Sequence, residues 1–160
     1  MCVLSDREIE EYVACGKLRI EPFIPEHMTP NGIDLCMHEA WIEGIAEKFV
    51  NAMVNIPPHT RFMLATREFL SLPDDLVGMI WLKTSLARKG VTGSFGLIDA
   101  GFAGTLTLAF YNSSNDAITL NPDAKIVQVC FEKMSKPAGK LYAVRSGHYQ
   151  NQKGVTFSRI

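Results

Sequence analysis

Short apolar runs separated by turn-forming residues dominate this chain from residue 18 onward. The runs include "RFMLAT", "LVGMIWL", "TLTLAFY" and "KIVQVCF", and between them lie stretches such as "TPNG", "NIPPHT", "SLPDD" and "NPDAK". Short runs of this kind are typical of strands, because a helix needs a longer repeat with a period near 3.6 residues. Proline, glycine, asparagine and aspartate favour turns. The sequence therefore predicts a mostly β sandwich or barrel.

One helix is expected near the start of the chain, in the stretch "SDREIEEYVACG". Ser5 can cap its first turn, and Glu8 stands three residues on, as in a capping box. Ile9 and Val13 recur on one helical face. Gly16 is expected to end the helix, because glycine readily adopts the left-handed backbone of a helix terminus.

The size and charge of the chain limit its organisation and its partners. With 160 residues, 47% of them hydrophobic, we expect one domain over residues 1–160. The formal net charge of −1 gives no general attraction for nucleic acid or an anionic membrane. No secretory signal or membrane-spanning segment is recognised, which predicts a cytoplasmic protein. The polar stretch from about 143 to 160 is either a frayed tail or an arm that orders on a ligand or a neighbouring subunit.

Cysteine and glycine spacing excludes several kinds of site. Cys2, Cys15, Cys36 and Cys130 are scattered without a C-x-x-C pair, so we expect buried free thiols rather than disulfides or a zinc site. The stretch "CMHE" holds metal-binding side chains too close together to form a site by themselves. The H-x-E and P-C-x-x-C pattern of zinc nucleobase deaminases is missing, as are the common nucleotide-binding glycine motifs.

The stretch "WLKTSLARKG" is a candidate anion site. An apolar strand leads into Lys83, then the hydroxyls of Thr84 and Ser85, then a short helix that carries Arg88. The start of a helix exposes unpaired N–H groups, and flanking hydroxyls and cations can complete a cradle for phosphate. The alternative is a capped surface helix whose charges are only solvated.

The stretch "FGLIDAGFAGTLTLAFYNSS" combines an acid, glycines and an alternating strand. A period of two puts Leu106, Leu108 and Phe110 on a core face and Ala109 on the opposite face. Asp99 precedes glycines that permit unusual backbone geometry, so its carboxylate could accept a proton from water. The alternative is an aspartate that closes a turn through its own backbone.

Other polar residues leave alternatives open. Asp34 follows the Pro-Asn-Gly turn, and Gln128 lies in an apolar strand, where its amide bonds either a neighbouring strand or a ligand. His148, Gln152 and Lys153 lie in the polar C-terminal stretch and are as compatible with solvation as with function.

Several of these stretches, taken in order, resemble the dCTP deaminase and dUTPase superfamily. They are "SDREI", "GKLRIEP", "NGIDL", "KTSLARKG", "GLIDAGFAGTLTLAFYNSS", "KIVQVCFEK" and "HYQNQKGVTFSRI". The match spans nearly the whole chain, and the last stretch looks most like the dCTP deaminase branch. The resemblance implies a distorted β-barrel of the dUTPase-like, jelly-roll type. It also implies a homotrimer with active sites at subunit contacts, and a deoxynucleoside triphosphate bound with Mg²⁺ mainly through its phosphates.

The resemblance also assigns roles to residues. Ser85 and Arg88 would hold phosphates, with Lys83 where the family usually has arginine and Thr84 where deaminases usually have serine. Asp99 would be the acid that activates water in members that hydrolyse dUTP. Phe102 would be the aromatic residue that lies against the deoxyribose. The triphosphate contacts would be Gln128, Tyr142, His148 and Gln152. Cys36 stands where an arginine is common, which bears on a trimer contact or a phosphate contact.

Ala109 decides between the reactions of the superfamily in this interpretation. The deaminating members carry a glutamate at this strand position, where it moves protons during metal-free attack of water on cytosine. A methyl group moves no protons, so we expect weak or absent deamination. The resulting prediction is a dUTP diphosphatase that forms dUMP and pyrophosphate with Asp99 as base. The alternatives are a dCTP deaminase, or a catalytically impaired homologue that binds deoxynucleoside triphosphates in a regulatory role.

Overall fold

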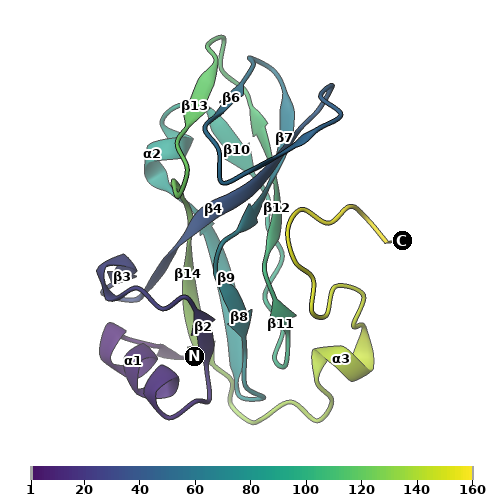
Figure 1. The fold of residues 1–160 in the computed structure, drawn as a ribbon. Helices are drawn as coiled ribbons and strands as arrows, with labels where there is room; N and C mark the ends of the chain where they lie inside the picture. The colour runs from purple at the N-terminus through teal and green to yellow at the C-terminus, as the bar shows by residue number, and fades with distance from the viewer. Residues whose placement is uncertain (1, 160) are drawn as a thin grey trace.

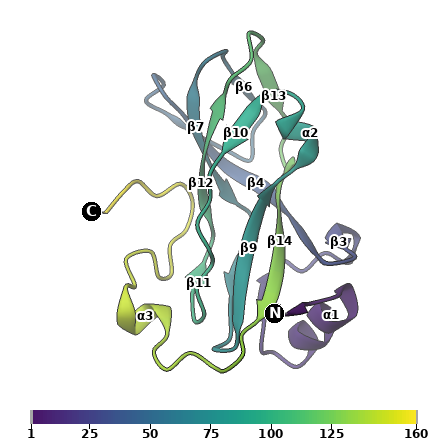
Figure 2. The ribbon, with the colours of Figure 1, turned by 180° about the vertical axis from the view of Figure 1, so that it is seen from behind.

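The structure is a computed structural model that describes residues 2–159, and it is mostly β (Figure 1). The long strands curl into half of a barrel, as Figures 1 and 2 show from opposite sides, which confirms the predicted distorted β-barrel class. Within residues 2–159, no helix is long and apolar enough to cross a bilayer.

The main sheet has nine strands, and its strands pair antiparallel. In spatial order its central path runs through β1 (Cys2–Val3), β14 (Lys125–Lys133), β4 (Gly32–Ile42), β7 (Arg61–Thr66), β12 (Thr107–Asn112) and β10 (Val91–Gly93). Three more strands join it: β9 (Leu76–Leu82) pairs with β14, while β3 (Met28–Thr29) and β5 (Lys48–Val50) pair with β4.

Two small sheets and four short helical segments complete the chain. One sheet contains β11 (Ala103–Gly104), β8 (Phe69–Ser71) and β2 (Arg19–Glu21), and the other contains β13 (Ile118–Leu120) and β6 (Val54–Ile56). The helices are α1 (Asp6–Ala14), α2 (Thr84–Ala87) and α3 (Tyr142–Arg145), with a 3-10 turn η1 (Pro25–His27).

The first helix forms as the sequence predicts. The hydroxyl of Ser5 accepts the backbone N–H of Glu8 at 3.4 Å, and the Glu8 carboxylate accepts the backbone N–H of Ser5 at 2.9 Å. This capping box satisfies N–H groups that have no partner inside the helix. The N–H and hydroxyl of Ser5 lower the pKa of Glu8, because both donate to its charged form. Gly16 has the expected positive φ of 74°.

The core lies inside the curl of the main sheet. Leu106, Leu108 and Phe110 are buried and Ala109 is exposed, which confirms the predicted faces of β12. Phe110 stacks on Phe62 of the neighbouring strand with ring centroids 5.3 Å apart. Such aromatic pairs stabilise a core by about 1 kcal/mol beyond the area they bury.

The C-terminal stretch is neither frayed nor detached in this chain. Gln152 and Val155 are buried, so the stretch packs as an arm against the outer face of the main sheet (Figure 1). The backbone of Val155 is held at both ends: its N–H donates to Glu39 at 3.0 Å, and its carbonyl accepts from Lys48 Nζ at 2.6 Å. The arm therefore orders on its own chain through a pair of charged side chains.

The expectation that all the thiols are buried is wrong for two of them. Cys2 and Cys15 are exposed, because one lies on a two-residue edge strand and the other follows the last turn of α1. Cys36 and Cys130 are buried. Burial raises the pKa of both thiols, and that of Cys36 reaches about 11 because the Glu68 carboxylate adds to the effect.

We expect two classes of thiol in a titration with a disulfide reagent near pH 8. Cys2 and Cys15 should react fast, whereas Cys36 and Cys130 should react slowly, because a raised pKa lowers the thiolate fraction at this pH and burial blocks access. All four thiols should react fast in denaturant. Rapid reaction of all four in the native protein would contradict this arrangement.

Candidate functional site

A cleft of about 370 Å³ lies where the connection from β10 to β11 meets α3 and the C-terminal arm. Its polar and aromatic lining residues are Asp99, Phe102, Thr107, Tyr142, Tyr149 and Gln152. Four of these were singled out from the sequence: Asp99, Phe102, Tyr142 and Gln152. Tertiary folding therefore brings four of the ten predicted site residues into one place.

A tight turn presents Asp99 to solvent at this cleft. The carbonyl of Asp99 accepts the N–H of Phe102 at 3.0 Å, and the carbonyl of Ala100 accepts the N–H of Tyr142 at 3.0 Å. Gly101 has φ of 81°, and a Cβ there would lie 2.6 Å from the Cβ of Leu141. Glycine is thus required for the turn to pack against α3. The exposed Asp99 side chain remains free to meet a ligand.

Two aromatic rings form the inner wall of the cleft. Phe102 is 6% exposed, and its ring meets that of Tyr142 edge to face with centroids 5.6 Å apart. The Tyr142 hydroxyl accepts the N–H of Tyr149 at 3.1 Å, which ties α3 to the arm. Rigid aromatic surface next to an exposed carboxylate suits a ligand with both a flat apolar part and hydrogen-bond donors.

Gln152 joins the arm to this cleft. Its side-chain amide donates to the carbonyl of Thr105 at 2.8 Å, and its backbone forms a parallel bridge with Gly104. The residue is 8% exposed, and its Oε1 atom has no hydrogen-bond partner among residues 2–159. An unpaired buried acceptor costs about 1–3 kcal/mol. A small movement of the arm that gave Oε1 a donor would recover this energy.

The predicted phosphate residues form a second group around α2. Thr84 and Ser85 occupy its first turn with exposed side chains, and Arg88 is exposed at its end. Lys83 precedes the helix, and its Nζ contacts both oxygens of the buried Asp34 at 2.8 and 2.9 Å. The ammonium of Lys125 lies 3.4 Å from the same carboxylate. Asp34 therefore fixes Lys83 beside the hydroxyls.

Gln128 and His148 take different places. The amide of Gln128 donates to the Thr29 hydroxyl at 2.8 Å, so in this chain it bonds a neighbouring strand. His148 is exposed on the arm, and its carbonyl accepts Arg159 Nη1 at 2.7 Å. Neither residue lines the cleft of Asp99.

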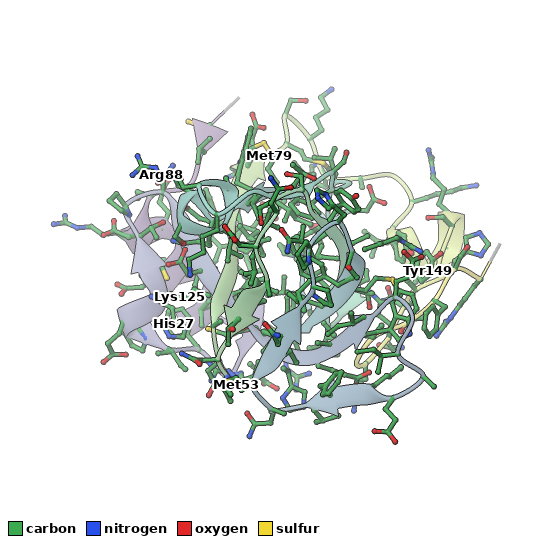
Figure 3. All side chains as sticks on the ribbon, turned by 90° about the horizontal axis from the view of Figure 1, so that it is seen from above. His27, Met53, Met79, Arg88, Lys125 and Tyr149 are labelled. Carbon is green, nitrogen blue, oxygen red and sulfur yellow. The ribbon has the colours of Figure 1, made fainter. Side chains whose placement is uncertain are left out.

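The residues around α2 and the cleft of Asp99 lie toward opposite ends of the folded molecule. Figures 1 and 2 both place α2 toward one end of the half-barrel and α3 toward the other. Figure 3 likewise shows Arg88 and Tyr149 on opposite sides of the molecule. One chain therefore does not bring Lys83, Thr84, Ser85 and Arg88 to the cleft of Asp99.

Ala109 lies on the outer face of β12, outside the core. Across the sheet its neighbours in register are Met63 and then Trp41. The adjacent row on this face contains Thr107, Ala65 and Glu39. Glu39 is bound to Lys48 at 3.0 Å and to the arm, so this acid already has a structural task.

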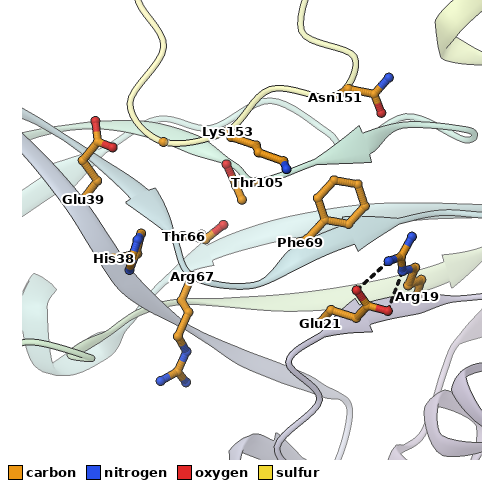
Figure 4. Close-up of a pocket in the computed structure, with 11 residues that line it drawn as sticks. Arg19, Glu21, His38, Glu39, Thr66, Arg67, Phe69, Thr105, Asn151 and Lys153 are labelled. Atoms are coloured by element: carbon orange, nitrogen blue, oxygen red, sulfur yellow. Dashed lines mark hydrogen bonds and ion pairs between the residues drawn. The ribbon is translucent and has the colours of Figure 1, made fainter. Parts of the chain in front are cut away.

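A larger hollow, of about 790 Å³, is lined by none of the residues that the family resemblance assigns to the nucleotide site (Figure 4). It lies between β2, β4, β7 and the arm. Both positive and negative side chains line it, and Arg19 is paired with Glu21 at 2.6 Å. A cavity in which opposite charges neutralise each other is a poor receptor for a polyanion.

Comparison with known proteins identifies the family. A family model described as dCTP deaminase-like matches residues 45–134. A dCTP deaminase of Thermococcus kodakarensis is 39% identical over 145 residues, which cover 89% of this chain and 92% of that protein. The chain belongs to the dCTP deaminase-like family. A "dCTP deaminase, dUMP-forming" of Aquifex aeolicus is 32% identical over 99% of this chain and 94% of that protein.

Solved structures agree with the fold of this family. The dCTP deaminase of Agrobacterium tumefaciens superposes with a TM-score of 0.71 at 18% identity, covering 83% of this chain and 48% of that one. The dUTPase of EIAV gives a TM-score of 0.51 at 18% identity, covering 77% of this chain and 93% of that one. Both confirm the half-barrel architecture of the superfamily.

The prediction of a dUTP diphosphatase is wrong as the main interpretation. The relatives in the family are named dCTP deaminase, and this is also the name of the structure with the TM-score of 0.71. That prediction depends on Ala109, a single position, whereas the relatives match over 89% and 99% of this chain. A single departure on an exposed strand face does not move a chain from one branch of a family to the other.

Two contacts that organise the site were not predicted from the sequence. Asp34 was noted only for following a turn, and its pairing with Lys83 joins residues 49 positions apart. Glu39 was noted only as part of a short metal-like stretch, and it binds the arm 116 positions away. Contacts at such separations leave no local pattern. An acid in an otherwise apolar stretch, as in "GIDLC", is the one signal that pointed toward Asp34.

We expect Lys83→Gln to destabilise the protein more than Lys89→Gln does. Without the Lys83 ammonium, the only cation near Asp34 in the described residues is Lys125, which is farther away at 3.4 Å. The free energy of unfolding should fall by about 1.5–3 kcal/mol, the usual contribution of a hydrogen bond to a charged group. Lys89 is exposed close to the same helix, so its removal should cost less than about 0.5 kcal/mol. Urea unfolding measures both values. Equal effects would mean that the Asp34 contact contributes nothing to stability.

Proposed function

We propose that this protein binds dCTP and converts it, with water, to dUTP and ammonia. The observation that carries the proposal is the formed cleft in which Asp99 stands beside the paired rings of Phe102 and Tyr142. The names of the relatives, which span nearly the same length, support dCTP as the substrate. A second candidate, a homologue that binds the nucleotide without turning it over, is favoured by Ala109 alone.

The nucleoside would occupy the cleft. Phe102 lines the cleft, and its apolar ring would favour a deoxyribose over a ribose, whose 2′-hydroxyl would lose hydrogen bonds to water against the ring. The exposed carboxylate of Asp99 is an acceptor for a sugar hydroxyl or for a water molecule. Tyr142 and Gln152 would contact the bound nucleotide, because both line the cleft.

The triphosphate would be held by Lys83, Thr84, Ser85 and Arg88. Lys83 is already fixed by Asp34, so less side-chain entropy is lost when it meets a phosphate. Mg²⁺ would enter with the nucleotide and be held mainly by the phosphate oxygens. Asp34, the acid closest to these cations in the contacts above, is occupied by two lysines and is a poor Mg²⁺ ligand. We place Gln128 and His148 as further contacts of the triphosphate.

A complete site requires more than one chain. The cleft of Asp99 and the phosphate group around α2 lie at opposite ends of the half-barrel, yet a single nucleotide must contact both (Figure 1). A homotrimer in which the α2 end of one subunit meets the cleft of the next solves this problem. In a closed ring each interface joins two different surfaces, so three subunits would form three equal sites.

The chemistry proceeds without the usual carboxylate on β12. Water must lose a proton as it attacks the cytosine ring, and the departing amine must gain one. Ala109 cannot carry either proton. The Asp99 carboxylate in the cleft, and the hydroxyls of Thr84 and Ser85 brought by the neighbouring subunit, are the groups that could relay a proton. We therefore propose slow deamination.

Replacement of Ala109 by glutamate tests this proposal. We expect slow release of ammonia and dUTP from dCTP by the natural sequence, and an increase of about two to four orders of magnitude in Ala109→Glu, because general acid and base groups contribute that much. Chromatography of the nucleotides and an ammonia assay measure both products. Ala109 is exposed, so the new side chain should not disturb the fold.

A glutamate elsewhere on the same face is the matched control. Tyr111→Glu places a carboxylate two residues along β12, and it should leave the rate unchanged. Nucleotide-dependent melting without any product would favour the second candidate. If dCTP changes neither melting nor product, both candidates fail.

Mixed trimers test the composite site. Arg88→Ala alters an exposed side chain beside α2, and Asp99→Asn alters one at the cleft. Each change should abolish dCTP binding in an oligomer made of that variant alone. When the two variants are unfolded together and refolded, about a quarter of the sites should combine two intact halves, because each interface is heterologous. Calorimetry with dCTP would count these sites, and light scattering should give about three times the 17.8 kDa of one chain. Mixtures that recover no binding would place both residues in one subunit's site.

A further inference from the structure

A cluster of three metal-binding side chains, none of them assigned to the nucleotide, lies close to Asp34 along β4. His27 ends η1, Cys36 lies in β4, and Glu68 lies in the turn between β7 and β8. One ligand atom from each residue lies within 4.8 Å of the other two. The sequence separations of 9 and 32 residues explain why no metal-binding spacing is visible in the sequence.

We propose that His27, Cys36 and Glu68 form a binding site for one Zn²⁺ ion. The distance from Cys36 Sγ to His27 Nδ1 is 3.7 Å. Two ligands of a tetrahedral zinc ion, with Zn–S near 2.3 Å and Zn–N near 2.0 Å, stand about 3.6 Å apart. The spacing of this pair is thus already that of two zinc ligands. A water molecule would take the fourth position.

The surroundings hold the ligands in place. One oxygen of Glu68 accepts the backbone N–H of Cys36 at 2.9 Å, and the other accepts Arg67 Nη2 at 3.2 Å. Each carboxylate oxygen keeps a second lone pair for a metal. Cys36 and Glu68 are each 1% exposed, whereas His27 is partly exposed, so an ion can enter from the side of the histidine. Such preorganised outer contacts strengthen metal sites.

The charges of the region also suit a divalent ion. The Arg67 guanidinium is paired with Asp123 at 2.7 Å as well as with Glu68, so it is not an isolated cation facing the site. Binding would release the thiol proton to solvent, which leaves a thiolate and a carboxylate to balance the two charges of the ion. Figure 3 shows His27 and Lys125 on the same side of the molecule. Lys125 is neutralised there by Asp34.

The mixed ligand set selects the metal class. Thiolate and imidazole ligands favour Zn²⁺ and related transition metals over Mg²⁺ and Ca²⁺, which prefer oxygen. The ion would tie η1 to β4 and to the β7–β8 turn, which already bond each other through Cys36. The site would therefore stabilise the part of β4 that also carries Asp34.

Titration with Co²⁺ alone tests the site, because a thiolate ligand gives a charge-transfer band that oxygen and nitrogen ligands do not give. The protein should carry the changes Cys2→Ser and Cys15→Ser, which remove the exposed thiols. We expect the band to saturate at one ion per chain and Zn²⁺ to displace it. Zn²⁺ should also raise the melting temperature, and a chelator should reverse this shift.

Variants separate the site from adventitious binding. His27→Gln changes a partly exposed side chain and should weaken Zn²⁺ binding by at least about tenfold. Cys36→Ser should abolish the charge-transfer band. Cys130→Ser removes the other buried thiol and should leave the band intact. Absence of the band, or a band that survives in Cys36→Ser, would overturn the proposal.

Discussion

The alternation of side chains along β4 between the core and the opposite face is the constraint on which the rest of this structure depends. β4 pairs with β14 along residues 33–36 and with β7 along residues 37–42, so it joins the two halves of the main sheet. Up to Met37 the odd-numbered residues, such as Ile33 and Leu35, belong to the core. A register shift between Met37 and Glu39 then reverses the phase, and Ala40 and Ile42 enter the same core. A bulge of this kind redirects side chains without ending the strand.

This reversal gives β4 three separate tasks. Before the bulge, Asp34 and Cys36 lie on the face away from the main core, where one meets lysines and the other meets His27. After the bulge, Glu39 lies on the outer face and holds the C-terminal arm through Val155. One strand therefore positions three features: the predicted phosphate-binding residues around α2, the candidate zinc site, and the contact that holds the C-terminal arm. A change in its register would displace all of them together.

The departures from the usual family residues fall on exposed or reorganised positions. Ala109 stands on the outer face of β12, where a small side chain costs the fold nothing. Lys83 keeps a positive charge before α2 but uses it to neutralise Asp34. The fold of the family is thus retained in a chain that carries alanine at position 109. Family membership follows from the scaffold, and the rate of any reaction follows from the side chains placed on it.

The sequence by itself determined those features that depend on near neighbours. Turn residues between short apolar runs fixed the β class, Ser5 and Glu8 fixed the start of α1, and alternation fixed the buried face of β12. These rest on backbone preferences and periods that act within a few residues. Only the tertiary structure decided which distant residues meet, as Lys83 with Asp34 or Glu68 with Cys36. Strand pairing and burial select those contacts over the whole chain, and a local pattern carries no record of the partner.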